Sequence, residues 1–308
     1  MLDGHAHYDL PWCVKQDKNN KDVYLVDAGY KLNEFASLTI SKEGKVTTEF
    51  VTTSESRSAE MDEFIADINE QVDEVANRVV ANIDVDLSIS DENGLRMVRN
   101  RETPIGNLVA DAYRIISGAD IGVVNGGGIR DNLSKGDVTY KQIKNVHPYG
   151  NLLMKKTTKG SSILDYLEFA NMKVKHDRIS EGKPAGEFGG FASVSGLKFS
   201  VDTSIPSSVV LDEHEFFLKV DGPRRVKDVK VLLDGEYVDI DPNKDYSIAS
   251  HDYLLEKAGD GASMFIEDEV ISTEVLFDYE ILVDYIVDVL DGHLASKYSY
   301  VEGRINIL

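Results

Sequence analysis

Apolar residues recur at three- and four-residue steps between positions 58 and 81, and this spacing predicts one long helix with a single apolar face. The residues on this face are Met61, Phe64, Ile65, Ile68, Val72, Val75, Ala76 and Val79. Glu60 and Asp62 lie near the start of the helix, where its dipole favours acidic side chains. Because the segment is long and acidic, it fits a helix that connects two domains, and it fits a surface helix packed on one domain equally well.

On the N-terminal side of this helix the pattern is that of short β-strands. Residues 23–28 and 36–40 predict two strands, and Gly44 predicts a turn into a third strand over 45–51. These strands show no evident core of their own, so the segment is expected to form a small β-rich unit.

After residue 83, helical and strand-like patterns alternate, which predicts a mixed α/β arrangement. Thr103 and Pro104 are typical of a helix start, and that helix is expected to end near Gly118. The other expected elements are a strand over 121–124, helices over 139–146, 161–172 and 278–296, strand-like residues over 188–200, a hairpin over 226–240 with its turn at Asp234-Gly235, and a strand that runs into a loop over 246–255.

Composition and charge exclude several classes of function. The chain has 308 residues with a formal net charge of -21, and such a surface repels nucleic-acid backbones and anionic membranes, which both need clustered Lys and Arg. No run of about 18 apolar residues predicts a membrane-spanning helix, and residues 1–10 lack the basic head and apolar core of a signal peptide. Cys13 is alone in the sequence, so neither a disulfide framework nor a cysteine-based metal site is expected.

The segment NGGGIR at 125–130, directly after an apolar strand, is the sharpest local signal for a ligand site. Its three glycines, with Gly127 at their centre, let the backbone adopt positive φ and approach a ligand closely. Asn125 supplies a hydrogen-bonding amide, and Arg130 supplies a fixed cation. The spacing matches neither a Walker phosphate loop nor a dinucleotide fingerprint. The same residues also fit a tight structural turn followed by a surface arginine.

Arg96, Arg99 and Arg101 precede the helix that is expected to begin near Pro104. Arginine suits carboxylate and phosphate oxygens, and a helix N-terminus adds amides that favour anions. In a chain of this charge, an anionic ligand requires a few arginines to converge locally. Each of the three residues taken singly also fits a solvated basic patch.

Two tyrosines lie in loops bounded by glycine or proline. Tyr149 is in HPYG at 147–150, and Tyr253 is in HDY at 251–253, shortly before GDG at 259–261. Aromatic side chains in such loops are candidates for stacking on a planar ligand. Two ordinary half-buried tyrosines would give the same pattern.

His5 and His7 are two residues apart, and in a strand such a pair points to the same side. Imidazoles placed in this way can hold a metal ion, but a catalytic metal usually has three or more protein ligands. The pair also fits two exposed histidines.

Taken together, these motifs resemble the C-terminal domain of 5′-nucleotidases, a group that includes bacterial UDP-sugar hydrolases and 2′,3′-cyclic-nucleotide phosphodiesterases. The segments that carry the resemblance occur in the family's order: RETPIGNLVADAYR, ADIGVVNGGGIRD, VHPYGN, GGFASVSGLKFS and AGDG. The resemblance implies an α+β (mixed α/β) fold with a four-layer-like C-terminal 5′-nucleotidase domain over 83–308. It also implies a linker helix over 56–82 and a small β-rich remnant of a metallophosphoesterase domain over 1–55.

The resemblance further implies roles for individual residues. The expected substrate-binding residues are Arg99, Arg101, Asn125, Gly127, Arg130, Tyr149, Tyr253 and Asp260. Among them, the two tyrosines would hold the base between their rings, and the aspartate would bind the ribose hydroxyls. The arginines would contact phosphate or ribose, with Arg101 as the weaker candidate, and the asparagine would hydrogen-bond base or ribose.

For the whole enzyme, the resemblance implies two divalent metal ions, zinc or manganese, with His5 and His7 as two of their ligands. The family's catalytic domain also has an Asp-x-His, a Gly-Asp and an Asn-His-Asp/Glu segment, and these are missing here; no Asn-His dipeptide occurs in the chain. The chain is therefore expected to be a fragment that lacks most of the metal-bearing catalytic domain. It should bind nucleotide without efficient turnover and without a metal of its own.

Three functions fit these observations: a two-domain nucleotide phosphohydrolase seen as a fragment, a non-catalytic module for a nucleoside or nucleotide sugar, and a surface or adhesion domain that has lost its ligand. The retained arginines, Asn125, both tyrosines and Asp260 disfavour the third. The expected partner is a nucleotide or nucleoside, not a nucleic-acid polymer, and no oligomeric state is indicated. The resemblance places such a protein outside the cell, in the cell wall or in the periplasm.

Overall fold

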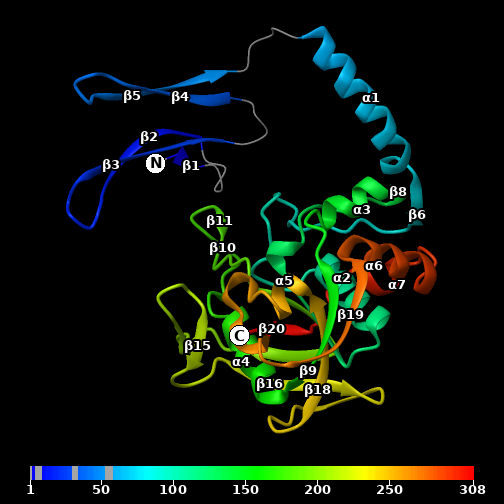
Figure 1. Ribbon diagram of the computed structural model, residues 1–308. Helices are drawn as coiled ribbons and strands as arrows, with labels where there is room; N and C mark the ends of the chain where they lie inside the picture. Colours follow the sequence, from blue (N-terminus) through cyan, green and yellow to red (C-terminus); the bar gives the residue numbers. More distant parts are fainter. Residues whose placement is uncertain (1, 4–8, 30–33, 53–57) are drawn as a thin grey trace. The chain divides into compact units, whose positions relative to one another are not determined.

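The computed structural model describes residues 2–3, 9–29, 34–52 and 58–308 (Figure 1). The chain divides into two compact units, Met1–Gln71 and Val72–Leu308, each of which has its own sheets. The three-part division expected from the sequence, with boundaries after residues 55 and 82, stays a prediction.

The first unit contains short strands, in agreement with the sequence pattern. Its elements are β1 (Leu2–Asp3), β2 (Asp9–Gln16), β3 (Asp22–Ala28), β4 (Glu34–Ile40) and β5 (Val46–Thr52). β3 lies between β1 and β2 in one small sheet, and β4 and β5 form an antiparallel hairpin. Trp12 stacks on Tyr24 across the β2–β3 pair, with 5.0 Å between ring centroids. The predicted strands over 23–28, 36–40 and 45–51 are confirmed.

Helix α1 (Ala59–Ala76) follows, and the prediction that it continues to residue 81 is wrong. Val79 instead begins β6 (Val79–Ile83), which pairs antiparallel with β8 (Gly136–Thr139). The β-branched pair Val79 and Val80 suits a strand, and the ladder with β8 satisfies its backbone groups. Pairing with a distant strand therefore overrides the helical spacing at this end.

A mixed five-stranded sheet forms the centre of the second unit. Its strands, in spatial order, are β12 (Ala192–Ser195), β7 (Ile121–Asn125), β18 (Asp245–His251), β9 (Leu152–Lys159) and β19 (Glu269–Phe277). β18 is parallel to β7, and the other neighbours are antiparallel. Side chains alternate across this sheet: Val123 enters one hydrophobic core and Val124 the other.

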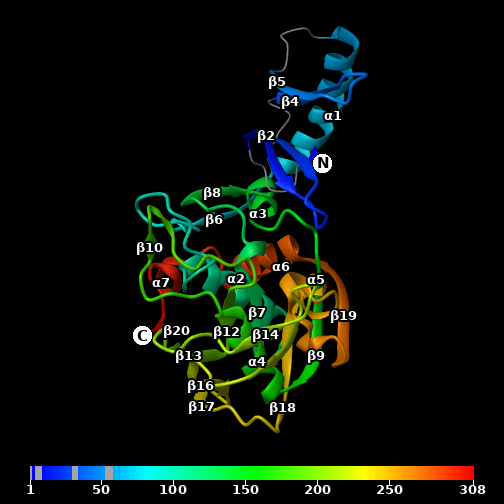
Figure 2. The ribbon, with the colours of Figure 1, turned by 90° about the vertical axis from the view of Figure 1, so that its left-hand side faces the viewer.

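Helices and a second sheet cover the two faces of this central sheet (Figure 2). Helix α2 (Pro104–Ser117) packs on the face of Val124. Helix α4 (Gly160–Ala170) packs on the face of Val123, together with a four-stranded sheet. The strands of that sheet, in order, are β17 (Glu236–Asp239), β16 (Val226–Leu233), β13 (Leu197–Val201) and β20 (Ile305–Ile307). The mixed α/β class predicted from the sequence is confirmed.

Shorter elements complete the unit. They are α3 (Tyr140–Val146), α5 (Asp252–Leu255), α6 (Asp278–Asp284), a π-helical turn (Tyr285–Val289), α7 (Ala295–Tyr298) and the strand pairs β10 (Ile179–Ser180) with β11 (Lys183–Pro184) and β14 (Val209–Leu211) with β15 (Phe217–Val220). The single helix predicted over 278–296 is wrong, because Asp291 and Gly292 adopt left-handed φ and interrupt it. Within the described part of the chain, no helix has the length and apolar character needed to cross a membrane.

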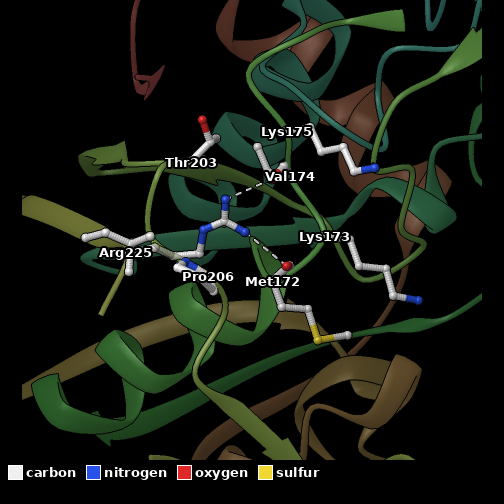
Figure 3. Close-up of a pocket in the computed structure, with 9 residues that line it drawn as sticks. Met172, Lys173, Val174, Lys175, Thr203, Pro206 and Arg225 are labelled. Carbon is white, nitrogen blue, oxygen red and sulfur yellow. Dashed lines mark hydrogen bonds between the residues drawn. The ribbon is translucent and has the colours of Figure 1, made fainter. Parts of the chain in front are cut away.

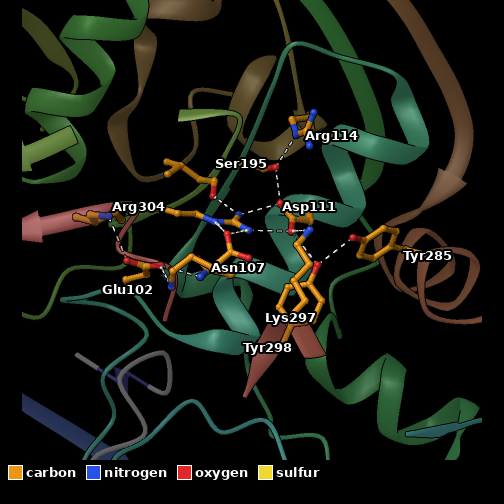
Figure 4. A network of polar contacts seen from close by, with 12 residues as sticks. Glu102, Asn107, Asp111, Arg114, Ser195, Tyr285, Lys297, Tyr298 and Arg304 are labelled. Carbon is orange, nitrogen blue, oxygen red and sulfur yellow. Dashed lines mark hydrogen bonds and ion pairs between the residues drawn. The ribbon is translucent and has the colours of Figure 1, made fainter. Parts of the chain in front are cut away.

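A buried polar network centred on Asp111 joins the C-terminal segment to α2 (Figure 4). Both carboxylate oxygens of Asp111 accept hydrogen bonds from the guanidinium of Arg304 at 2.8 Å, and Tyr298 and Lys297 also contact the carboxylate. Burial alone would raise the pKa of Asp111, but its partners, Arg304 first, hold that pKa well below its usual range. The network therefore fastens α7 and the segment leading into β20 to the helix that covers the central sheet.

Candidate functional site

The glycine loop after β7 lies against the backbone of other loops. Gly127 N–H donates a hydrogen bond to Gly189 O at 2.7 Å. A Cβ at Gly126 would lie 2.3 Å from Val98 O, so glycine is needed for this approach. The expectation of positive φ is wrong, because residues 126–128 form a 3-10 turn without left-handed φ. Close backbone packing is therefore what the three glycines provide.

Asn125, Tyr253 and Asp260 meet beside this loop. Asn125 Nδ2–H donates to Asp260 Oδ2 at 2.6 Å, although the residues are 135 positions apart. The Tyr253 hydroxyl accepts from Asp260 N–H at 3.1 Å and lies 3.4 Å from Asp260 Oδ1. Burial raises the pKa of Tyr253, and neighbouring Asp260 and Tyr149 raise it further. The site therefore combines an acceptor carboxylate, a fixed amide and a half-buried ring.

The AGDG turn holds Asp260 in this position at a conformational cost. Ala258 and Asp260 have φ of 51° and 55°, in the left-handed region. Such a backbone costs on the order of 1–3 kcal/mol for a residue other than glycine. Between them, a Cβ at Gly259 would lie 2.2 Å from the Tyr253 ring. The turn is thus packed tightly beneath the ring and presents the carboxylate next to it.

Two of the predicted arginines belong to the same cluster of charges. Burial lowers the pKa of Arg99, the positive charges of Arg96 and Arg130 lower it further, and Glu187 and Asp260 oppose this effect. Arg99 Nη1 lies 3.8 Å from Glu187 Oε1, and its side chain is 18% exposed. The guanidinium groups of Arg99 and Arg130 therefore act on the same small region as the Asp260 carboxylate.

Arg130 and Arg101 differ in what they contact. Arg130 Nη1–H donates to Gly127 O at 3.3 Å, which keeps this guanidinium against the glycine loop. Arg101 Nη2–H donates instead to Asp177 O at 3.4 Å, and Arg178 is the charge that most affects it. Of the two, only Arg130 lies with the residues of the candidate site.

The loops that carry the two tyrosines are joined beneath the site by a buried aromatic layer. The rings of His147 and His251 both meet Tyr113 edge-on, with centroid distances of 6.3 and 6.0 Å. Tyr149 and Tyr253 each follow one of these histidines by two residues. Tyr149 is 60% exposed and Tyr253 37% exposed. Both rings are thus exposed at the surface, and the histidines that precede them in sequence pack against the same buried residue, Tyr113.

Both histidines are neutral at pH 7. Burial lowers the pKa of His147 to about 3 and that of His251 to about 4. His147 Nδ1–H donates to Gly128 O at 3.1 Å, and His251 contacts Asn125 directly. Neither histidine was predicted as a site residue, although each of the two candidate tyrosines follows a histidine at the same spacing.

A cavity of about 450 Å³ lies outside the candidate site (Figure 3). Its lining residues, which include Lys173, Lys175 and Thr203, share no member with the cluster around Asp260. Arg225 also lines it, but this guanidinium donates to the carbonyls of Met172 and Val174 at 3.0 and 2.9 Å. Because the buried guanidinium of Arg225 is already hydrogen-bonded to backbone carbonyls, we assign no ligand to this cavity.

The predicted metal ligands His5 and His7 lie outside the described residues, so their role stays a prediction. Within residues 2–3, 9–29, 34–52 and 58–308, no three side chains of the types that bind metals converge. The described residues therefore do not fit a catalytic metal centre, and no catalytic step is derived through one.

Known proteins resemble this chain in sequence and structure. A trifunctional nucleotide phosphoesterase protein, YfkN, of Bacillus subtilis (strain 168) is 30% identical over 304 residues, which are 97% of this chain and 17% of that protein. A 5′-nucleotidase of Vibrio cholerae is 26% identical over 217 residues, which are 66% of this chain and 36% of that protein. The chain thus spans well under half the length of these relatives.

A solved structure has a similar fold. The 5′-nucleotidase precursor of Thermus thermophilus superposes with a TM-score of 0.64 at 25% identity, covering 100% of this chain and 57% of that one. The family model of the 5′-nucleotidase C-terminal domain matches residues 79–267. This range contains Arg99, Asn125, Arg130, Tyr149, Tyr253 and Asp260. The chain therefore belongs to the 5′-nucleotidase C-terminal domain family.

Proposed function

We propose that the second unit binds the nucleoside part of a nucleotide and presents the phosphoester to a metal-dependent hydrolase domain of the 5′-nucleotidase type. The observation that carries this proposal is the junction of Asn125, Tyr253 and Asp260, which a hydrogen-bonded set of loops holds together. A carboxylate that accepts hydrogen bonds beside a half-exposed ring suits a ribose joined to a planar base. The names of the relatives support the same class of ligand.

The roles follow from the chemistry of each group. The base would stack on Tyr253, with Tyr149 on the other side of the ligand, because an aromatic face accepts any base. Asp260 would accept hydrogen bonds from the ribose hydroxyls, which are donors that a deoxyribose partly lacks. Asn125 would hold Asp260 in place and hydrogen-bond the ligand with its remaining capacity.

The arginines account for how an anionic ligand is bound by an acidic protein. The chain carries a net charge of -21, so its average field disfavours a phosphate. Arg99 interacts electrostatically with both Arg130 and Asp260, and Arg130 donates to Gly127 O in the glycine loop beside Asn125, so the two arginines can offset this field locally. Arginine also matches phosphate oxygens with paired N–H groups. We therefore assign phosphate recognition to these two residues.

Replacing Arg130 by alanine should weaken the binding of AMP more than that of adenosine. A hydrogen bond to a charged group contributes about 1.5–3 kcal/mol, so the extra loss for AMP should be roughly 10- to 150-fold. Isothermal titration of both ligands measures the difference. Arg101→Ala is the matched control and should change neither affinity, because Arg101 donates to Asp177 O. Equal losses of affinity for AMP and adenosine would indicate that Arg130 contacts the ribose and not the phosphate.

For the whole protein, we propose nucleotide catabolism by phosphoester hydrolysis, with two divalent metal ions and a location outside the cytoplasm. This chain alone is expected to bind but not to turn over, because the sequence segments that complete the family's metal site are missing from its 308 residues. Phosphate released from AMP in the presence of manganese or zinc should stay near background. Turnover of about 1–10³ per second, the usual range of enzymes, would contradict this expectation. The alternative, a non-catalytic nucleoside-binding module, predicts the same result for this chain.

A further inference from the structure

A chain of hydrogen bonds leads from the backbone of α5 to the carboxylate of Asp260. Leu254 N–H donates to His251 Nδ1 at 3.2 Å, and His251 Nε2 lies 3.0 Å from Asn125 Oδ1. Asn125 Nδ2–H then donates to Asp260 Oδ2 at 2.6 Å. His251 is 1% exposed and Asn125 is 3% exposed, so water does not compete for these bonds. The residues come from two neighbouring strands, β7 and β18, and from the turn after α5.

Each bond in this chain fixes the direction of the next. A backbone N–H can only donate, so Nδ1 of a neutral His251 must carry the lone pair and Nε2 the proton. Nε2–H therefore donates to the oxygen of the Asn125 amide, and the NH₂ group of that amide must face Asp260. The opposite amide orientation would place two acceptor oxygens 2.6 Å apart, which is repulsive. Burial lowers the pKa of His251 to about 4, so the ring is neutral at pH 7, and the bond from Leu254 N–H sets its tautomer.

We infer that His251 is a positioning residue for ribose recognition: it locks the Asn125 amide, and through it the Asp260 carboxylate, in the orientation that accepts the ribose hydroxyls. This inference rests on the proposed function and deepens it. Asn125 Nδ2–H occupies one lone pair of Asp260 Oδ2, and the Tyr253 hydroxyl lies 3.4 Å from Oδ1, so the remaining lone pairs of the two oxygens are those that can accept from two vicinal hydroxyls. Without the hydrogen bond from His251 Nε2–H, the Asn125 amide can rotate, and the Asp260 carboxylate then loses its fixed donor.

A purely structural role for His251 is the competing explanation, and the geometry separates the two. His251 is also the N-cap of α5, since its Nδ1 accepts from Leu254 N–H. Asparagine places its polar atoms near the position of Nδ1 and is a preferred N-cap residue. Glutamine is longer and places its amide NH₂ near the position of Nε2. His251→Asn therefore keeps the bond from Leu254 N–H that caps α5 and loses the bond to Asn125 Oδ1. His251→Gln keeps the bond to Asn125 Oδ1 and loses the cap.

The test is the affinity of the full chain for adenosine relative to 2′,3′-dideoxyadenosine, measured by isothermal titration for the wild type and both variants. The wild type and His251→Gln should prefer adenosine by at least about tenfold, as expected for hydrogen bonds to a charged group. His251→Asn should lose most of this preference while it keeps its affinity for the dideoxynucleoside. In addition, ¹⁵N chemical shifts of the wild-type imidazole should show a protonated Nε2 and an unprotonated Nδ1 at pH 7.

Each outcome decides between the explanations. An unchanged ribose preference in His251→Asn, or a loss confined to His251→Gln, would overturn the positioning role and leave the cap as the function of His251. A wild-type ring protonated at Nδ1 would also overturn it. If the wild type binds neither nucleoside, the proposed function fails and ribose positioning fails with it. If the wild type binds both equally, the proposed site stands for the base, and both the ribose contact of Asp260 and this inference are overturned.

Discussion

Replacing Asp111 by alanine is expected to lower the free energy of unfolding of the second unit by about 3–5 kcal/mol, because removing one partner of a buried ion pair leaves the other charge uncompensated. Arg304, its main partner, has a side chain that is only 4% exposed. The substitution would also remove an acceptor from Tyr298 and Ser195. Urea denaturation of the wild type and the variant, followed by circular dichroism, measures the change.

Two control variants make this result specific. Asp239→Ala removes a surface ion pair with Lys230, whose side chains are 84% and 43% exposed, and it should cost no more than about 1 kcal/mol. A double variant, Asp111→Leu with Arg304→Met, replaces the buried pair with apolar groups and should recover most of the loss. A loss for Asp111→Ala as small as that for Asp239→Ala would show that the network contributes little to stability.

Replacing Tyr253 by alanine is expected to weaken the binding of adenosine by about 1–3 kcal/mol, the range found when an aromatic ring that stacks on a base is removed. The ring is half-buried, and its hydroxyl accepts from Asp260 N–H, so its orientation is fixed before a ligand binds. Calorimetric titration measures the affinity, and quenching of tyrosine fluorescence in the wild type reports the same event.

Tyr253→Phe is the matched control, because it keeps the ring face and removes only the hydroxyl. Its affinity for adenosine should stay within a few-fold of the wild type. If phenylalanine and alanine weaken binding equally, the hydroxyl and its contact with Asp260 matter, and the ring does not stack. If neither variant changes the affinity, the base does not lie against Tyr253.

Local signals were enough to predict several elements. Thr103 caps α2 by accepting from Gly106 N–H at 3.2 Å, as its position before a proline suggested. The hairpin turn at Asp234-Gly235 is confirmed by the pairing of β16 with β17. In both cases the residues that determine the cap or the turn lie within a few positions of one another, so the local sequence is enough to predict these two features.

Elements whose stability depends on distant partners were missed. β9 lies within the central sheet, but its sequence LLMKKTTK does not read as a buried strand. Lys156 is nevertheless 2% exposed, because its Nζ donates to the carbonyls of Phe265 and Ile266 at 2.7 and 3.1 Å. Only the tertiary structure supplies these acceptors, so the hydrophobic pattern could not indicate the strand.

The candidate site shows the same division between local and distant information. The loops at 125–130 and 259–261 were recognisable from their glycines, and Asn125 and Asp260 lie in them. Which arginines converge could not be read from spacing: Arg99 and Arg101 are two residues apart, yet Arg101 donates to Asp177 O. His147 and His251 share one local signal, a tyrosine two residues later, but their burial and their hydrogen bonds to Gly128 and Asn125 depend on distant segments and could not be predicted.

A crystal structure of the full chain soaked with adenosine would show whether loops from residue 99 to residue 260 form one nucleoside site. We expect electron density for the base against the ring of Tyr253, with Tyr149 on its other side and the ribose hydroxyls within hydrogen-bond distance of Asp260. Adenosine bound elsewhere, such as in the cavity lined by Arg225, with the Asp260 carboxylate facing only water, would contradict it.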